Sequence, residues 1–180
     1  MISSQQQSLL QSYKEKSFVA AILAEEAYNY YCFIKNVINI PLIICNSAMV
    51  CINAIITDNE LLKILNIILN SSTGLILSLI SNFKIYENIS LFGKIRTKYT
   101  KLNHLIDTKM ANELDVIDND FILQIINDYD NITIECDSIY PIHIKARIRN
   151  QYKDKMSLPS SLTAEIVECK NNCCNCVSVI

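Results

Sequence analysis

The sequence predicts an all-α membrane protein, in which a lead helix, a two-helix transmembrane hairpin and a cytosolic helical layer follow one another. Two uncharged, apolar stretches, residues 36–57 and 64–83, carry this prediction. A hydrocarbon core of about 30 Å takes roughly 20 helical residues, so each stretch is long enough to cross it. The polar linker between them leaves room only for a tight turn. With 2 Gly and 3 Pro among 180 residues, the chain also lacks the turn residues of a β architecture.

The basic residues near the two spans predict their orientation, because lysine and arginine favour the cytosolic side. One basic residue, Lys63, adjoins the turn, whereas several follow the second span and several precede the first: Lys84, Lys94, Arg96, Lys98 and Lys101, and Lys14, Lys16 and Lys35. We therefore expect an integral membrane protein with both termini cytosolic. Residues 1–36 carry charges and no apolar leader, so the first span is expected to act as its own insertion signal.

The segments around the spans have helical periodicity. After an N-terminal extension over residues 1–16, a lead helix from about Ser12 should run into the first span, because apolar and aromatic residues recur at helical spacing: Phe18, Ile22, Ala24, Tyr28 and Tyr31. Tyrosines gather where an aromatic belt lies at a membrane surface. Pro41 should kink the first span. The apolar stripe after the second span continues without a break, so span and stripe are expected to form one helix ending near Asn112.

Two shorter helices and a tail complete the chain. One helix should begin after Asp118 and stop at Tyr140-Pro141, and a basic helix should follow over residues 142–152, before a weakly periodic tail over 156–180. The stretch between residues 111 and 137 contains eight acidic residues and no Lys or Arg, while the segments on either side are basic. Antiparallel packing of an acidic helix between two basic ones is therefore expected.

Polar residues form a stripe on each span. Asn39, Asn46 and Asn53 recur every seven residues in the first, and Asn66, Asn70 and Thr73 share a stripe in the second. An amide that faces lipid tails is costly, so these stripes should face protein or water. Three interpretations are open: packing inside the hairpin, contact between subunits of a homo-oligomer, and the lining of a pore. A pore requires several hairpins, because two helices enclose no channel.

Two further groups have more than one interpretation. Lys145, Arg147, Arg149 and Lys153 of the basic helix are candidates for contact with anionic headgroups, and the alternative is pairing with the acidic helix. Cys173, Cys174 and Cys176 are candidates for S-acylation. An unmodified tail and thiolate metal binding are the alternatives, although a zinc site usually joins two separated ligand pairs and the tail has one cluster. We expect no metal and no cofactor.

Several classes of function are not indicated. The sequence has no glycine-rich phosphate loop, no Ser/His/Asp or Cys/His set in a supporting context, and no carboxylate pair in a plausible cleft, so we expect no enzyme. A net charge of −2 provides no basic footprint for nucleic acid. The expected partners are the lipid bilayer and further copies of the chain.

The order of the parts suggests a family. Its marks are the tyrosine-bearing lead helix (AEEAYNYY, residues 24–31), the two spans with a minimal turn, the Tyr99-x-x-Leu102-x-x-x-Ile106 helix, the acidic helix and the Tyr140-Pro141-Ile142 break. Over residues 17–155 the chain resembles the SLATT family, the two-transmembrane effector domains associated with SMODS nucleotidyltransferases and SLOG sensors, with relatives in large DNA viruses.

The resemblance implies a membrane effector that oligomerises and permeabilises or perturbs a membrane when a nucleotide-dependent partner triggers it. No part of this sequence resembles the sensor itself. For a viral copy that stands alone, the resemblance allows a structural role instead, in a virion or host membrane and with a virion protein as partner.

Overall fold

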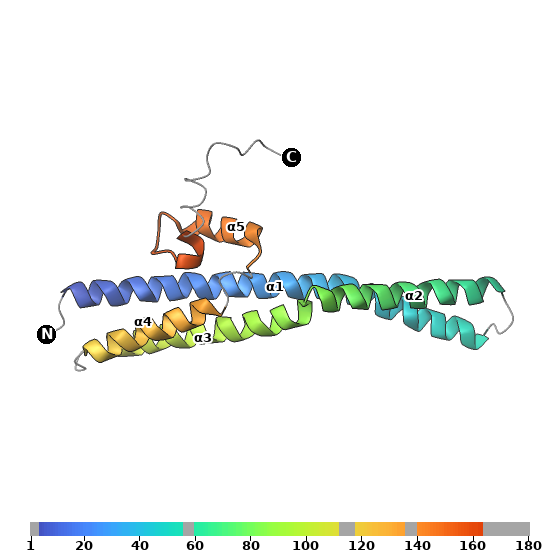
Figure 1. Cartoon of the computed structure of the whole chain (residues 1–180), viewed down its shortest axis with the longest axis horizontal. Helices are drawn as coiled ribbons and strands as arrows, with labels where there is room; N and C mark the ends of the chain where they lie inside the picture. Colours follow the sequence, from blue (N-terminus) through green and yellow to red (C-terminus); the bar gives the residue numbers. More distant parts are fainter. Residues whose placement is uncertain (1–3, 56–59, 112–117, 136–139, 164–180) are drawn as a thin grey trace, which may run out of the picture. The chain divides into compact units, whose positions relative to one another are not determined.

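A computed structural model describes residues 4–55, 60–111, 118–135 and 140–163 (Figure 1). These residues form five helices: α1 (Ser4–Ile55), α2 (Glu60–Asn82), α3 (Ile85–Ala111), α4 (Asn119–Ile134) and α5 (Ile142–Tyr152). The described part of the chain contains no strand, so the predicted all-helical class is confirmed. Pro41 lies inside α1, and the helix continues through it.

The chain divides into two compact units. The apolar unit is Tyr28–Leu91, which holds the second half of α1, all of α2 and the first residues of α3. The mixed unit is Met1–Ala27 together with Phe92–Ile180. Each unit has its own packing and is described by itself.

Aromatic rings at the centre of the mixed unit join three helices. The ring of Tyr129 in α4 meets Tyr13 of α1 edge-on at 5.4 Å between centroids, and meets Tyr99 of α3 at 5.8 Å. The predicted stripe of α3 is buried here, with Phe92, Ile95, Tyr99, Leu102 and Ile106 all nearly inaccessible. Burial of such side chains contributes about 1.5–3 kcal/mol each, so this stripe is a main source of the unit's stability.

The chain after α4 also packs on the mixed unit. The ring of Tyr140, just before Pro141, lies 4.9 Å from that of Phe92, and α5 buries Ile144 and Ile148, one turn apart. The segment 156–163 then returns to α1, where the backbone N–H of Ser157 donates a 2.9 Å hydrogen bond to Glu15. This first part of the expected loose tail is therefore packed, and the rest of the tail lies outside the described residues.

The lead helix differs from the sequence-based expectation in its start and in its buried face. It begins at Ser4 rather than near Ser12, so residues 4–16 belong to α1, and Leu10 is buried. Of the predicted periodic residues, Ala24 is buried, whereas Phe18 is 40% exposed. The other buried positions include Val19, Leu23 and Ala27.

A break separates α2 from α3, so the single helix expected from the sequence is wrong. Buried positions recur every three or four residues in a helix, but Ile80 is followed by Ile85 as the next buried residue. One additional residue rotates a helical stripe by about 100°. The backbone leaves the helical conformation at Lys84, which has a positive φ of 52°. Its N–H donates a hydrogen bond to the carbonyl of Ser81 at 3.0 Å.

The ion pairs of the mixed unit correct the predicted order of charged helices. Lys98 of the basic α3 does pair with Glu135 at the end of the acidic α4. The basic α5, however, uses Arg147 to pair with Glu26 of α1, rather than with α4. Two more pairs, Lys14–Asp107 and Arg96–Glu25, join α1 to α3. The position of α1 therefore decides which charges meet.

Candidate membrane-spanning helices and their polar stripes

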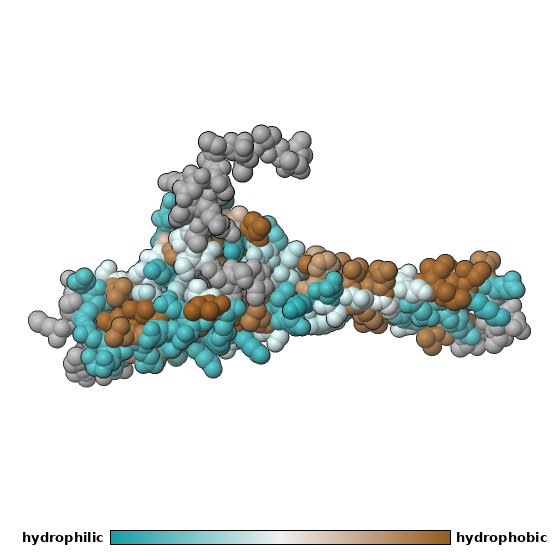
Figure 2. All heavy atoms as spheres, viewed as in Figure 1, coloured by the Kyte–Doolittle hydropathy of each residue, from teal (hydrophilic) through white to brown (hydrophobic). Residues whose placement is uncertain are grey.

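Two helices of the chain are long and apolar enough to cross a membrane. In their most apolar stretches, 0% and 6% of the residues are buried inside the protein. A core helix of a soluble domain would be mostly buried, because apolar burial is what stabilises it. Figure 2 shows hydrophobic residues on the visible surface of this part of the chain. The exposed large hydrophobic residues of α1 and α2 include Ile40, Ile43, Ile44, Val50, Ile64, Ile67, Ile68 and Leu75.

Within the apolar unit, five of the six predicted stripe residues lie on partly covered helix faces. Asn39, Asn46 and Asn53 are half-buried along α1, and Asn66 and Thr73 are half-buried along α2. We call this set the inner stripe. Its neighbours on the same faces are also the least exposed of the unit, among them Leu42, Met49, Leu69, Ile76 and Ile80. The asparagines of α1 thus lie where the helices of this unit cover one another.

The hydrogen bonds of the inner stripe are mostly local. The Asn70 amide donates to Asn66 Oδ1 at 3.1 Å, and the Thr73 hydroxyl donates to the Leu69 carbonyl at 2.8 Å. One bond joins two helices, since the Asn39 amide donates to the Tyr86 hydroxyl at 2.8 Å. These bonds satisfy polar groups that would otherwise be costly in an apolar environment.

A second polar stripe on α2 faces outward. Asn70, Ser71, Gly74 and Ser78 are exposed and recur at helical spacing, and we call them the outer stripe. A Cβ atom added at Gly74 would meet no atom within 4 Å beyond the neighbouring backbone of α2, so no other described element covers this position. Sequence reasoning placed Asn70 with Asn66 and Thr73 and did not include Gly74. The spacing of small residues three and four apart was the signal for this surface.

The four basic candidates of α5 have different environments. Arg147 is held by Glu26, whereas Lys153 is exposed at the end of the helix. Lys145 and Arg149 are half-buried. The helix therefore does not present its four basic side chains as one free surface.

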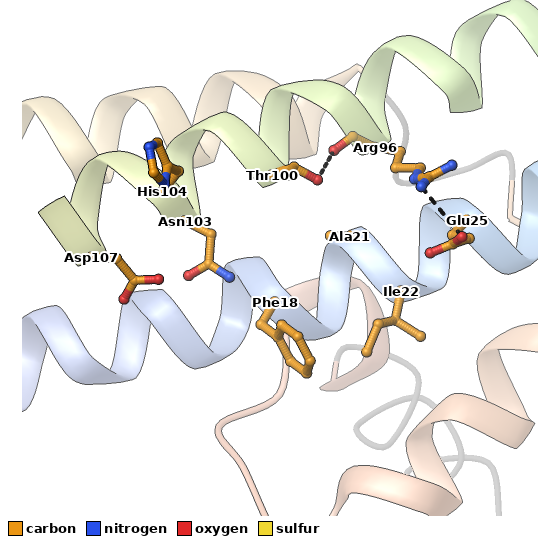
Figure 3. Close-up of a pocket in the computed structure, with 9 residues that line it drawn as sticks. All are labelled: Phe18, Ala21, Ile22, Glu25, Arg96, Thr100, Asn103, His104 and Asp107. Carbon is orange, nitrogen blue, oxygen red and sulfur yellow. Dashed lines mark hydrogen bonds and ion pairs between the residues drawn. The ribbon is translucent and has the colours of Figure 1, made fainter.

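A pocket of about 350 Å³ lies between α1 and α3 in the mixed unit (Figure 3). Phe18 and Ile22 line its apolar part, and Asn103, His104 and the paired Glu25 and Arg96 line its polar part. His104 is exposed and lies at the edge of this pocket. Arg96 and Glu25 lie 3.4 Å apart, and Asp107 is bound by Lys14, so most of the charge here is already paired.

The cysteines and metal ligands add no site among the residues described. Cys45 and Cys51 are exposed on α1 and Cys32 is half-buried, all as free thiols. The described ranges hold no group of three or more His, Cys, Asp or Glu side chains that could bind a metal. The acylation candidates Cys173, Cys174 and Cys176 lie outside the described residues.

No protein-family model, curated protein or solved structure matches this chain. The two apolar helices and their polar stripes therefore carry the functional argument by themselves.

Proposed function

We propose that this protein is an integral membrane effector that oligomerises and forms a pore in, or otherwise perturbs, a bilayer. The observation that carries the proposal is the near-absence of burial along the two apolar helices, 0% and 6% in their most apolar stretches. So much exposed apolar surface is unfavourable in water, and a bilayer removes it from water along the whole length of both helices. In this arrangement α1 and α2 span as a hairpin with both termini on the cytosolic side.

The two polar stripes have separate roles in this proposal. The inner stripe, with Asn46 at its centre, holds the hairpin together, as polar residues between transmembrane helices do. The outer stripe, with Asn70 and Gly74, would face lipid in a single copy. Exposed polar groups are costly there, and small residues let helices approach closely, so contact with further copies removes the cost. Several hairpins arranged in this way place the outer stripes at subunit contacts or around an aqueous lumen.

Two paired substitutions test the pore. Asn70→Leu changes the exposed outer stripe, and Asn46→Leu changes the half-buried inner stripe. We expect release of an entrapped dye from liposomes to collapse with Asn70→Leu while the helix content is retained. Asn46→Leu should act mainly on the thermal stability of the protein in detergent. Wild-type protein that releases no dye at any protein-to-lipid ratio would eliminate the pore.

Membrane insertion is tested separately, by sedimentation of a cell lysate. The protein should sediment with membranes, resist extraction by alkaline carbonate, and dissolve only in detergent. Recovery of the unfused chain in the supernatant after high-speed sedimentation without detergent contradicts insertion, and with it the whole proposal.

A non-conducting anchor is the second candidate, and one observation favours it. The three asparagines of α1 are turned toward the covered side, so a single hairpin already shields most of its polar groups. In this role the mixed unit would recruit a partner, such as a virion protein, to the membrane. Asn70→Leu would then leave both partner recruitment and membrane attachment unchanged, and no variant would conduct.

A further inference from the structure

We propose that the outward face of α4 in one copy docks on the outward face of α5 in a second copy of this chain. The contact is head-to-tail, between an acidic and a basic helix. This inference rests on the proposed membrane assembly, in which several copies share one bilayer, and it specifies how their mixed units meet.

The outward face of α4 combines acidic groups with exposed apolar side chains. Asp120, Leu123, Asn127, Asp130 and Ile134 are exposed and recur at spacings of three and four residues, so they share one stripe. Leu123 is 57% and Ile134 is 80% exposed, which is high for such residues outside the apolar helices. α4 has no Lys or Arg. Asp120 and Asp130 make no ion pair with any residue that the structure describes.

The outward face of α5 has the opposite charge and its own exposed apolar residue. Ile142, Ala146 and Lys153 are exposed, and the half-buried Arg149 lies on the same stripe. Ile142 is 76% exposed. The helix contains no Asp or Glu. Within the described ranges, neither Arg149 nor Lys153 makes an ion pair.

The two stripes match in register. Asp130 follows Leu123 by seven residues in α4, and Arg149 follows Ile142 by seven residues in α5. Seven residues advance a helix by about 10 Å, close to two turns. Laid side by side, the two helices can bring Asp130 of one copy opposite Arg149 of the next, with exposed apolar side chains of both faces beside this pair.

The structure favours a second copy over a contact within one chain. α5 is attached to α1 through Arg147 and Glu26, while α4 contacts α1 through the rings of Tyr129 and Tyr13. Figure 1 draws α4 and α5 on different sides of α1. Two different faces that complement each other make a heterologous contact, which builds rings when its rotation closes.

Exposed ion pairs contribute little to affinity, so the charges chiefly select partner and register. Confinement of the apolar helices to one membrane holds the copies together. The docking of α4 on α5 then fixes their order around the assembly.

Charge reversal with rescue tests the contact in the full chain in mild detergent. A photo-crosslinking amino acid replaces Leu123 in isotopically heavy copies, which are mixed with light copies. We expect cross-links to light peptides that contain residues 142–153. Asp130→Arg in the heavy copies together with unchanged light copies should lower the yield by roughly fivefold, the factor that about 1 kcal/mol represents. Arg149→Asp in the light copies, mixed with heavy copies that carry no charge reversal, should lower the cross-link yield by the same factor.

Combining heavy Asp130→Arg copies with light Arg149→Asp copies should restore the yield, because opposite charges face each other again. Lys94→Asp, a reversal on the exposed side of α3, is the matched control and should leave the yield unchanged. Asp130→Asn and Arg149→Gln, which remove a charge without reversing it, repeat the test in case a reversed variant does not fold. Absence of rescue, or an equal loss with Lys94→Asp, overturns the inference.

The cross-linking experiment and the dye-release experiment distinguish failure of the docking from failure of the proposed pore. Dye release that persists while no cross-link to residues 142–153 forms refutes the docking and leaves the pore intact. Cross-links that form and follow the charge pattern in a protein that releases no dye support the docking and refute the pore.

Discussion

The side-chain amide of Asn39 donates a 2.8 Å hydrogen bond to the hydroxyl of Tyr86, which ties the middle of α1 to the first turn of α3. The two residues are on either side of α2 in the sequence, so this bond closes the apolar unit at one end. It lies close in sequence to Lys84, the residue at which α2 and α3 separate. The polar groups of the apolar unit therefore help to set its internal geometry.

A double-mutant cycle on this pair measures that contribution. Asn39→Ala and Tyr86→Phe each remove one partner, and we expect a coupling of about 0.6 kcal/mol, the usual value for a hydrogen bond between membrane helices. The measurement is the free energy of unfolding in detergent micelles, followed by circular dichroism. A coupling indistinguishable from zero contradicts the bond.

Replacing Lys84 by glycine should stabilise the protein. The backbone at Lys84 has a φ of 52°, in the left-handed region that costs a non-glycine residue about 1 kcal/mol. Glycine adopts this conformation without steric cost. We expect Lys84→Gly to raise the free energy of unfolding by up to about 1 kcal/mol. The control, Lys94→Gly in the interior of α3, should lower it by about the same amount. A loss of stability from Lys84→Gly contradicts the break at this residue.

The attachment of segment 156–163 to α1 should weaken in acid. The pKa of Glu15 is held below its ordinary value of 4.5, first by the backbone N–H of Ser157 and then by the Gln11 side chain. A lowered pKa means that the ionised form stabilises the fold above the unfolded pKa and that this contribution is lost as the pH falls through the folded pKa. The protection factor of the Ser157 amide, which corrects for the intrinsic pH dependence of exchange, should therefore fall as the pH drops through the lowered pKa of Glu15.

Glu15→Gln tests the cause of that pH dependence. The glutamine side chain cannot ionise, so the protection factor of the Ser157 amide should be lower at neutral pH and should not change with acid over the same range. Glu87→Gln, which removes an exposed carboxylate 3.8 Å from Lys84, is the control and should leave the profile of Ser157 unchanged. An acid-induced change that persists in Glu15→Gln assigns it to another group.

The mixed unit should stay folded in mild alkali and unfold when Tyr129, at its aromatic centre, ionises. Burial raises the pKa of Tyr129 from 10.0 to about 12. The folded state therefore favours the neutral phenol, and its stability is lost as the pH rises from about 10 to about 12. Tyrosinate absorbance should show a late step that coincides with loss of helix content. Tyr129→Phe should remove that step, while Tyr152→Phe, at the end of α5, should keep it.

The outer stripe of α2 should control self-association without affecting the fold of one chain. Beyond the neighbouring backbone of α2, no atom lies within 4 Å of a Cβ built at Gly74, and we therefore expect Gly74→Leu to be accommodated in the isolated chain. If copies approach here, the added bulk separates them, and the oligomer in mild detergent should dissociate. Ser72→Leu adds the same bulk roughly 160° around the helix and is the matched control. Equal behaviour of the two variants removes the outer stripe from the contact.

The sequence by itself determined the helical class and the two apolar stretches, because these depend on composition and local periodicity. It also identified the α3 stripe that is buried. Each of these features depends on residues that lie within a few helical turns of one another in the sequence. The acidic helix was predicted to stop at Tyr140-Pro141, but α4 ends at Ile134.

Only the tertiary structure decided which faces were covered. It separated Asn70 from Asn66 and Thr73, exposed Phe18 and brought Arg147 to Glu26 rather than to α4. It also broke the predicted long helix at Lys84. Periodicity gives the relative phase of residues within one helix, but burial and pairing depend on the neighbour that arrives from elsewhere in the chain. That neighbour is fixed by packing across the whole unit, which no local pattern encodes.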